Sequence, residues 1–263
     1  MDLGLKGKIA VVGGSSRGLG RAIAGELAAE GASLVVTARS EHAVAEAAES
    51  IARAAGVHVV GVAADTSKPE GVAALAGAAF REFGRIDVLV TNTGGPPAGP
   101  FESHSPAAWQ SAVDRLLFSV VELSRAALPG MKERGWGRII NITSITVKQP
   151  VAELMLSNSI RAAVTGFART LANEVAASGV TVNCVLPGYT RTDRVTELAG
   201  RVASARGLRP EDMLHAWDDE IPMKRIAEPP ELAALVAFLA SERASYITAA
   251  SIPVDGGWIR SLY

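Results

Sequence analysis

The sequence predicts an α/β fold in which about seven parallel strands form one doubly wound sheet flanked by helices on both faces. Short apolar runs alternate with longer amphipathic stretches along the 263 residues. The apolar runs carry almost no polar side chains, which is typical of strands covered on both sides. Apolar residues make up 48% of the chain, enough for one large core. We therefore expect a single domain spanning residues 1–263.

The expected elements alternate regularly. Strands are expected at Lys8–Gly13, Ser33–Ala38, Val57–Ala63, Ile86–Thr91, Arg138–Ile142, Val180–Leu186 and Ser251–Val254. Helices are expected at Leu19–Glu30, Glu41–Ala55, Pro69–Phe83, Ala107–Lys132, Ala152–Ala177 and Glu231–Ala240. Right-handed crossovers between such units place the strands parallel in a three-layer sandwich.

One stretch interrupts this alternation. Residues 190–230 are polar, rich in arginine and contain several prolines. They follow the carboxyl end of an expected strand, where sheets of this kind keep their ligand crevice. We expect a lid over the substrate; the alternative is a surface insertion without a functional role.

The charge balance and the cysteine content exclude several classes of protein. The net charge is −1, with 26 basic and 27 acidic residues, so no field attracts nucleic acid or a membrane surface. The one cysteine, Cys184, has no internal partner for a disulfide, which favours a reducing compartment. No signal pattern opens the chain, no apolar run approaches the roughly 18 residues of a membrane span, and no cluster has metal-ligand spacing. A cytoplasmic protein is expected.

A glycine cluster lies between the first expected strand and the first expected helix. It reads Gly13-Gly14-Ser15-Ser16-Arg17-Gly18-Leu19-Gly20. Glycines permit a tight turn and a close approach of the backbone to a pyrophosphate, and the helix that follows presents unpaired N–H groups to the phosphates. This context predicts a Rossmann fold that binds a dinucleotide. The alternative is a glycine turn without a ligand.

The end of the second strand indicates which dinucleotide is bound. A carboxylate there would bind the 2′-hydroxyl of NAD, but the sequence reads Thr37-Ala38-Arg39-Ser40. Arg39 and Arg17 together suit a 2′-phosphate, because guanidinium groups match its geometry. NADP(H) is therefore favoured over NAD(H). The alternative is that both arginines are solvated surface charges.

Several motifs in the right order resemble the short-chain dehydrogenase/reductase family, especially its 3-oxoacyl-carrier-protein-reductase-like branch. They are Gly14-x3-Gly18-x-Gly20, Asp65-Thr66, Asn92-Thr93-Gly94, Pro187-Gly188 and Asp255-Gly256-Gly257. The resemblance covers essentially the whole chain. With the glycine turn, it implies a set of cofactor-binding residues: Gly14, Ser16, Arg17, Gly18, Leu19, Gly20, Arg39, Asp65, Thr66, Asn92, Gly94, Arg161, Pro187 and Gly188.

The resemblance also implies where the catalytic residues lie. Ser144 matches the family's serine, whereas Ser157 and Arg161 fall where the family has its tyrosine and lysine. Leu116 falls at the family's active-site asparagine. A serine hydroxyl is a far weaker acid than a phenol, and arginine does not release a proton near neutral pH. Tyr189 is a substitute acid if it faces the pocket; the alternative is that it packs against the lid.

Two functions remain open. The first is an NADP(H)-dependent oxidoreductase with Ser144, Ser157 and Arg161 as catalytic residues. Its substrate is a carbonyl or enoyl compound, and the arginine-rich lid suggests an anionic one such as a CoA or carrier-protein thioester. The second is a catalytically degenerate cofactor-binding protein that acts as a partner subunit or sensor. In either case the resemblance implies a homo-oligomer, a dimer or tetramer, formed through the long helices at Ala107–Lys132 and Ala152–Ala177.

Overall fold

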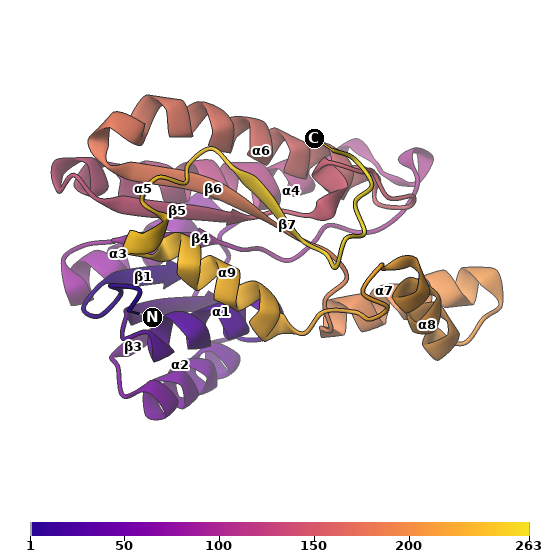
Figure 1. Ribbon diagram of the computed structural model, residues 1–263, viewed down its shortest axis with the longest axis horizontal. Coiled ribbons are helices and arrows are strands. Elements are labelled where there is room, and N and C mark those ends of the chain that lie inside the picture. Colours follow the sequence, from indigo (N-terminus) through magenta and orange to yellow (C-terminus); the bar gives the residue numbers. More distant parts are fainter. Residues whose placement is uncertain (1, 263) are drawn as a thin grey trace.

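The computed structural model describes residues 2–262, with the side chain of Ala205 left out. Its strands form one parallel sheet in the order β3-β2-β1-β4-β5-β6-β7 (Figure 1). The strands are β1 (Ile9–Val12), β2 (Ser33–Ala38), β3 (Val59–Ala63), β4 (Val88–Thr91), β5 (Gly137–Ile142), β6 (Val180–Pro187) and β7 (Ser251–Val254). The predicted doubly wound α/β fold is confirmed.

Helices cover both faces of the sheet (Figure 1). One face carries α1 (Gly18–Ala29), α2 (Glu41–Ala55) and α9 (Pro229–Ala240). The other face carries α3 (Pro69–Phe83), α5 (Ser119–Glu133) and α6 (Met155–Val175). The strands are apolar on both sides because each side meets a helix layer: Ala10 and Val12 belong to the first core, and Val11 belongs to the second.

Local signals explain why some elements begin and end where the sequence predicts. The expected and observed bounds coincide for β2, β7, α2 and α3. At the start of α2, the Ser40 hydroxyl accepts a hydrogen bond from the backbone N–H of Ala43. At its end, Gly56 takes a left-handed conformation with φ of 69°. Capping signals of this kind are local, so the sequence reveals them.

Two helical predictions need correction. The stretch predicted as one helix at Ala107–Lys132 consists of α4 (Pro106–Val113), a π-helical turn (Asp114–Phe118) and α5. The helix predicted to begin at Ala152 begins at Met155. Glu153 has φ of 62°, which no α-helix contains, and its carbonyl accepts a hydrogen bond from the Gly99 N–H.

Residues 190–230 form a helical arm that extends beyond the carboxyl ends of the strands (Figure 1, orange). The arm contains α7 (Asp193–Arg206) and α8 (Pro210–Glu220). Its helices share a small apolar core formed by Ala199, Ala203, Met213, Trp217, Ile221 and Ile226. The arm is therefore a folded unit and not a loose loop.

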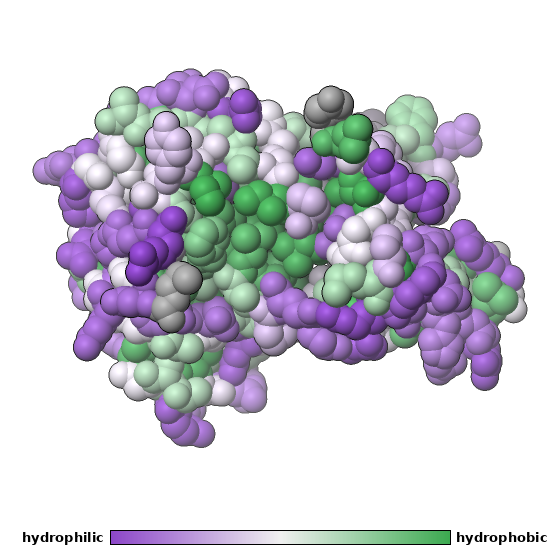
Figure 2. Space-filling model, in the orientation of Figure 1, coloured by the Kyte–Doolittle hydropathy of each residue, from purple (hydrophilic) through white to green (hydrophobic). Residues whose placement is uncertain are grey.

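An apolar area lies on the surface around β7 and the adjoining side of α9 (Figure 2). Half-buried residues of these elements include Leu235, Phe238, Ile252 and Val254. β7 is the last strand of the sheet, so its outer edge has no neighbouring strand within the described chain. None of the helices within residues 2–262 combines the length and apolar composition that a membrane crossing requires.

Candidate functional site

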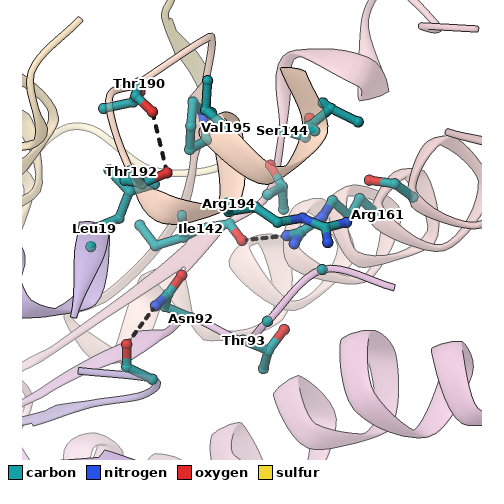
Figure 3. A pocket seen from close by; sticks show the side chains of 18 of the residues that line it. Leu19, Asn92, Thr93, Ile142, Ser144, Arg161, Thr190, Thr192, Arg194 and Val195 are labelled. Atoms are coloured by element: carbon teal, nitrogen blue, oxygen red, sulfur yellow. Dashed lines mark hydrogen bonds between the residues drawn. The ribbon is translucent and has the colours of Figure 1, made fainter. Parts of the chain in front are cut away.

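The strand order reverses between β1 and β4, and a crevice opens there at the carboxyl ends of the strands. A cavity of about 450 Å³ lies along this edge. Its walls come from the glycine loop before α1, the segments after β4, β5 and β6, the start of α6 and the start of α7 (Figure 3). Residues of three predicted motifs, the glycine turn, Asn92-Thr93-Gly94 and Pro187-Gly188, therefore meet in one place although they are far apart in the chain.

The glycine loop has the shape that a pyrophosphate requires. Gly14 and Gly18 have φ of 54° and 56°, which favour glycine. A Cβ on Gly20 would lie 2.2 Å from the carbonyl oxygen of Gly14, so α1 packs directly against the loop. The first turn of α1 contains no acidic residue, and Arg17 at its N-cap makes no side-chain capping bond. The positive end of the helix is thus left for an anion, and the loop fits a dinucleotide.

Two side chains hold this loop in place. The Asn92 amide donates to the carbonyl oxygens of Gly13 and Gly14, at 3.1 and 3.3 Å. The Ser15 hydroxyl donates to the Val12 carbonyl at 2.8 Å and accepts from the Thr37 N–H at 2.9 Å. Ser15 therefore ties the loop to β1 and β2, a positioning role that the sequence analysis missed because serine is common in turns.

Several of the residues that line the cavity are arginines. Arg39, one of the predicted cofactor-binding residues, lines it, and so does Arg115 of the π-helical turn, which the sequence analysis did not single out. Arg17 also lines the cavity, and its guanidinium pairs with the Asp193 carboxylate at 3.1 Å. Charge alone in the sequence does not reveal that Arg115 faces the same space as Arg39.

Asp65 and Thr66 follow β3, but they are not among the residues that line this cavity. The Asp65 carboxylate accepts hydrogen bonds from the backbone N–H and the hydroxyl of Ser67, at 3.1 and 2.7 Å. Burial raises the pKa of Asp65, but the bonds from Ser67 and the charges of Arg115 and Arg39 hold it below its usual value.

The remaining predicted cofactor-binding residues divide into two groups. Ser16 and Gly20 lie outside the cavity lining, whereas Leu19, Gly94, Pro187 and Gly188 are part of it.

Ser144, Ser157 and Arg161 all line the cavity. The Ser144 hydroxyl oxygen accepts a hydrogen bond from the Thr146 N–H at 3.2 Å. That contact uses an oxygen lone pair, so the hydroxyl proton of Ser144 stays available to an acceptor in the cavity. The three residues that the resemblance assigns to catalysis thus lie in one cavity, and their catalytic roles stay a prediction.

Arg161 carries a positive charge into a largely enclosed place. Its guanidinium donates from Nη1 to the Ile142 carbonyl at 2.9 Å (Figure 3). Burial, with the nearby charge of Arg194, lowers the pKa of Arg161 to about 10. Arg161 is therefore still protonated at neutral pH and offers hydrogen-bond donors to the cavity.

Leu116 is enclosed by apolar neighbours. It lies in the π-helical turn, is 2% exposed and clusters with Ala112, Leu156 and Ile160. An apolar side chain here offers no hydrogen bond to a water that would carry a proton. π-Helical turns often mark functional sites. The turn is present here although leucine stands where the family has its active-site asparagine.

Tyr189 packs against the arm. Its ring stacks on Trp217 with centroids 4.5 Å apart and meets Trp258 edge to face at 6.1 Å. Burial first, and the charge of Glu220 second, raise the pKa of Tyr189 to about 12. Tyr189 also lines the cavity, so it both packs against the arm and faces the pocket, and its role as a substitute acid stays a prediction.

The arginines of the arm have different environments. Arg191 pairs with Glu228 at 2.7 Å and Arg209 with Asp212 at 2.7 Å, both on the surface. Arg194 instead lines the cavity, and its Nη2 donates to the Pro96 carbonyl at 2.8 Å. Thr192, another lining residue that the sequence analysis missed, lies beside it.

Within residues 2–262 no group of three or more histidine, cysteine, aspartate or glutamate side chains is placed to hold a metal ion.

Comparison with known proteins identifies relatives of the whole chain. Residues 14–259 match the family model described as enoyl-(acyl carrier protein) reductase. The chain is 37% identical over 259 residues to the 3-oxoacyl-[acyl-carrier-protein] reductase FabG of Pseudomonas aeruginosa, covering 98% of this chain and 100% of that protein.

Solved structures also resemble this chain over nearly its whole length. The L-sorbose reductase of Gluconobacter frateurii, in complex with NADPH and L-sorbose, superposes with a TM-score of 0.95 at 39% identity over 100% of both chains. A variant of actinorhodin polyketide ketoreductase with NADPH gives a TM-score of 0.93 at 31% identity, over 97% of this chain and 98% of that one. With these matches over nearly its full length, the chain belongs to the short-chain dehydrogenase/reductase family of NAD(P)-dependent oxidoreductases.

Proposed function

We propose that this protein reduces a carbonyl group with NADPH, using Ser144, Ser157 and Arg161 around the reacting carbon. One observation carries the proposal: these three side chains line the same cavity as the glycine loop. A dinucleotide held by that loop and a substrate beside Ser144 would therefore share one enclosed space.

The cofactor is held from both ends in this proposal. Gly14, Gly18 and the N-terminus of α1 hold the pyrophosphate, because their backbone N–H groups and the helix dipole favour an anion. Arg39 binds the 2′-phosphate, which distinguishes NADPH from NADH. Arg17 joins it when its guanidinium exchanges the Asp193 carboxylate for the phosphate. The NADPH complexes of the sorbose reductase and the polyketide ketoreductase support this choice.

Bound NADPH supplies the hydride, and the residues of the chain manage the charge that develops on oxygen. Ser144 donates its hydroxyl proton in a hydrogen bond to the carbonyl oxygen, as its bond from Thr146 allows. Arg161 binds the nicotinamide ribose and lends positive charge to the developing oxyanion. Ser157 passes a proton from water, since its own hydroxyl is too weak an acid to act like a phenol.

Carbonyl compounds are the substrate class that the relatives support. The named relatives are reductases of 3-oxoacyl-[acyl-carrier-protein], of L-sorbose and of a polyketide. Enoyl or acyl thioesters remain within the proposal. However, surface ion pairs occupy Arg191 and Arg209, so these residues give the thioester no specific support.

A second candidate is a protein that binds NADPH without chemistry of its own. The observation that favours it is the environment of Leu116, which is buried among apolar side chains where the family's asparagine stands. With serine at position 157 as well, the usual route for the proton is missing. Such a protein would act as a partner subunit or a sensor.

Two measurements separate these candidates. Quenching of tryptophan fluorescence by NADPH is expected under both of them. Loss of nicotinamide absorbance with ketoses, 3-oxoacyl thioesters, enoyl thioesters or dicarbonyls is expected under the first alone. Binding without turnover on the whole panel would select the second candidate, and absence of NADPH binding would overturn both.

The role of Ser144 is tested by substitution. Ser144→Ala should lower kcat/KM about 100-fold, because a donor to the oxyanion is lost. Ser159→Ala is the matched control, since Ser159 is exposed on α6. An unchanged rate in Ser144→Ala would show that the site is assigned to the wrong residue.

The assembly and the location of the protein are further parts of the proposal. A homodimer or tetramer would pack through the helices of residues 106–133 and 155–175, where the Phe118 side chain is 50% exposed. Light scattering of the protein and of Phe118→Asp tests this: a monomer in both cases would contradict it.

The proposed location is the cytoplasm. Cys184 is buried and forms no disulfide, which agrees with a reducing compartment.

A further inference from the structure

Among the described arginines of the arm, Arg194 is the one that lines the cavity. Its side chain leaves the first turn of α7 and crosses to the segment after β4, where it donates to the Pro96 carbonyl at 2.8 Å. A Cβ on Gly95 would lie 3.1 Å from its Nη2, so the guanidinium lies close against the floor of the cavity. The side chain is therefore held in place over the site.

Two positive charges meet at this point. Arg194 and Arg161 point toward each other in the cavity (Figure 3). Burial lowers the pKa of Arg161, and the charge of Arg194 lowers it further. Like charges in a partly enclosed site repel each other more strongly than in water.

Two carboxylates, Asp193 and Glu197, also line the cavity, and Asp193 pairs with Arg17. Within residues 2–262, neither Arg161 nor Arg194 forms an ion pair within 4.0 Å. Glu197 favours the charged form of Arg194, but burial and the charge of Arg201 oppose it more strongly. The arrangement differs from that of Arg191 and Arg209, which have carboxylate partners on the surface. The five arginines that line the cavity outnumber its two carboxylates, so the cavity carries positive charge that a bound anion would balance.

We propose that Arg194, supported by the charge of Arg161, binds an oxyanion of the substrate, so that the protein selects keto acids or phosphorylated carbonyl compounds over neutral ketones. The inference rests on the proposed function, because it places the carbonyl at Ser144 in the same cavity. A guanidinium suits this task, since its donors match the two oxygens of a carboxylate or phosphate group. The carbonyl and the anion of one small molecule would then contact different walls of the site.

The diphosphate of the cofactor is a second oxyanion that Arg194 could bind. The two possible anions predict different effects of substituting Arg194. An arginine that binds the substrate anion changes the preference among substrates, whereas one that binds the diphosphate changes the affinity for NADPH. The experiment therefore measures both quantities in the same variants.

Arg194→Met removes the charge and keeps much of the length of the side chain. Arg191→Met is the matched control, because Arg191 lies on the same arm and pairs with Glu228 on the surface. Each protein is assayed with levulinate and with its neutral methyl ester, and its NADPH affinity is measured by fluorescence. The unmodified protein should prefer levulinate, and Arg194→Met should lower the ratio of the two kcat/KM values about tenfold or more. Arg191→Met should keep that ratio.

A binding measurement makes the result independent of turnover. Calorimetry with malonate, succinate and inorganic phosphate on the NADP⁺-loaded protein should detect binding that Arg194→Met weakens about tenfold or more. Absence of binding by all three anions would overturn the inference, as would an unchanged preference ratio in Arg194→Met. A tenfold loss of NADPH affinity with the preference retained would assign Arg194 to the diphosphate and would also overturn it. If the anions bind but nothing is reduced, the inference holds and the proposed reduction fails.

Discussion

Arg161 donates a hydrogen bond from Nη1 to the carbonyl oxygen of Ile142, the last residue of β5, at a distance of 2.9 Å. The contact fixes the guanidinium at the carboxyl edge of the sheet, in the cavity that Ser144 and the glycine loop also line. Because burial lowers the pKa of Arg161 to about 10, its charge is complete at neutral pH and is lost as the pH rises through that value.

NADPH affinity should therefore depend on pH in a specific way. At neutral and mildly alkaline pH the dissociation constant of NADPH should not change. It should then rise as Arg161 loses its proton near pH 10. Arg161→Met should bind NADPH more weakly at neutral pH and should lack this transition. Fluorescence titrations of both proteins check the expectation; the same transition in Arg161→Met would assign it to another group.

Arg39 should decide between the two dinucleotides. Arg39→Ala should raise the dissociation constant of NADPH about tenfold or more, because a charge-assisted hydrogen bond to the 2′-phosphate is lost. NADH, which lacks that phosphate, should bind almost unchanged. Arg53→Ala is the control, since Arg53 is exposed on α2 and pairs with Glu49. Equal losses for NADPH and NADH would contradict the assignment of Arg39 to the 2′-phosphate.

Alanine substitutions at two glycines of α1 should have different effects, a loss of NADPH affinity at Gly20 and a gain of stability at Gly25. In Gly20→Ala, the new Cβ would approach the Gly14 carbonyl to 2.2 Å, so the loop must move and NADPH affinity should fall tenfold or more. In Gly25→Ala, the new Cβ would meet no atom within 4 Å. That variant should be about 0.5–1 kcal/mol more stable, because alanine favours the helix. Urea unfolding and NADPH titration measure both effects, and normal affinity in Gly20→Ala would contradict the account of the loop.

The family's catalytic set can be rebuilt in this chain. The triple variant Ser157→Tyr, Arg161→Lys and Leu116→Asn should reduce ketones about 100-fold faster, since a phenol beside an ammonium group supplies the proton. The same triple variant with Ser157→Phe has a ring of similar size and no hydroxyl, so it should show no such gain. The initial rate of NADPH oxidation is measured for both variants. Equal rates would indicate that proton transfer to the carbonyl oxygen does not limit the reaction.

Glu231 should contribute to stability in a manner that depends on pH. Its carboxylate accepts hydrogen bonds from the Arg225 guanidinium at 2.5 and 2.7 Å and from the Glu228 N–H at 2.8 Å, and these lower its pKa from 4.5 to about 2. A carboxyl whose pKa is lower in the folded state stabilises the fold above the unfolded value of 4.5 and loses that effect as the pH falls toward 2.

The test compares urea unfolding of the protein and of Glu231→Gln from about pH 7 to about pH 3. The unmodified protein should be more stable at neutral pH, and the difference should shrink below pH 4.5. Glu133→Gln, an exposed position at the end of α5, is the control and should show no such trend. A constant difference across the range would contradict the ion-pair account.

The site shows where sequence reasoning was sufficient and where it was not. Gly14, Gly18 and Asn92 could be assigned because their motifs describe a local backbone shape and its immediate support. Arg115 and Thr192 could not be assigned, since their residue types are common on surfaces. For Tyr189 the sequence offered two placements as alternatives, and the structure shows both: the ring stacks on Trp217 and also lines the cavity.

The sequence by itself determined the alternation of strands and helices, the glycine turn and the caps of α2, because hydrophobic periodicity and backbone freedom act between near neighbours in the chain. Only the tertiary structure decided which arginines face the cavity. Arg191 and Arg194 are three positions apart in one polar stretch, yet one pairs with Glu228 on the surface and the other contacts Pro96 across the cavity. These contacts join residues that are distant in the chain, so their partners are set by how the arm folds over the sheet.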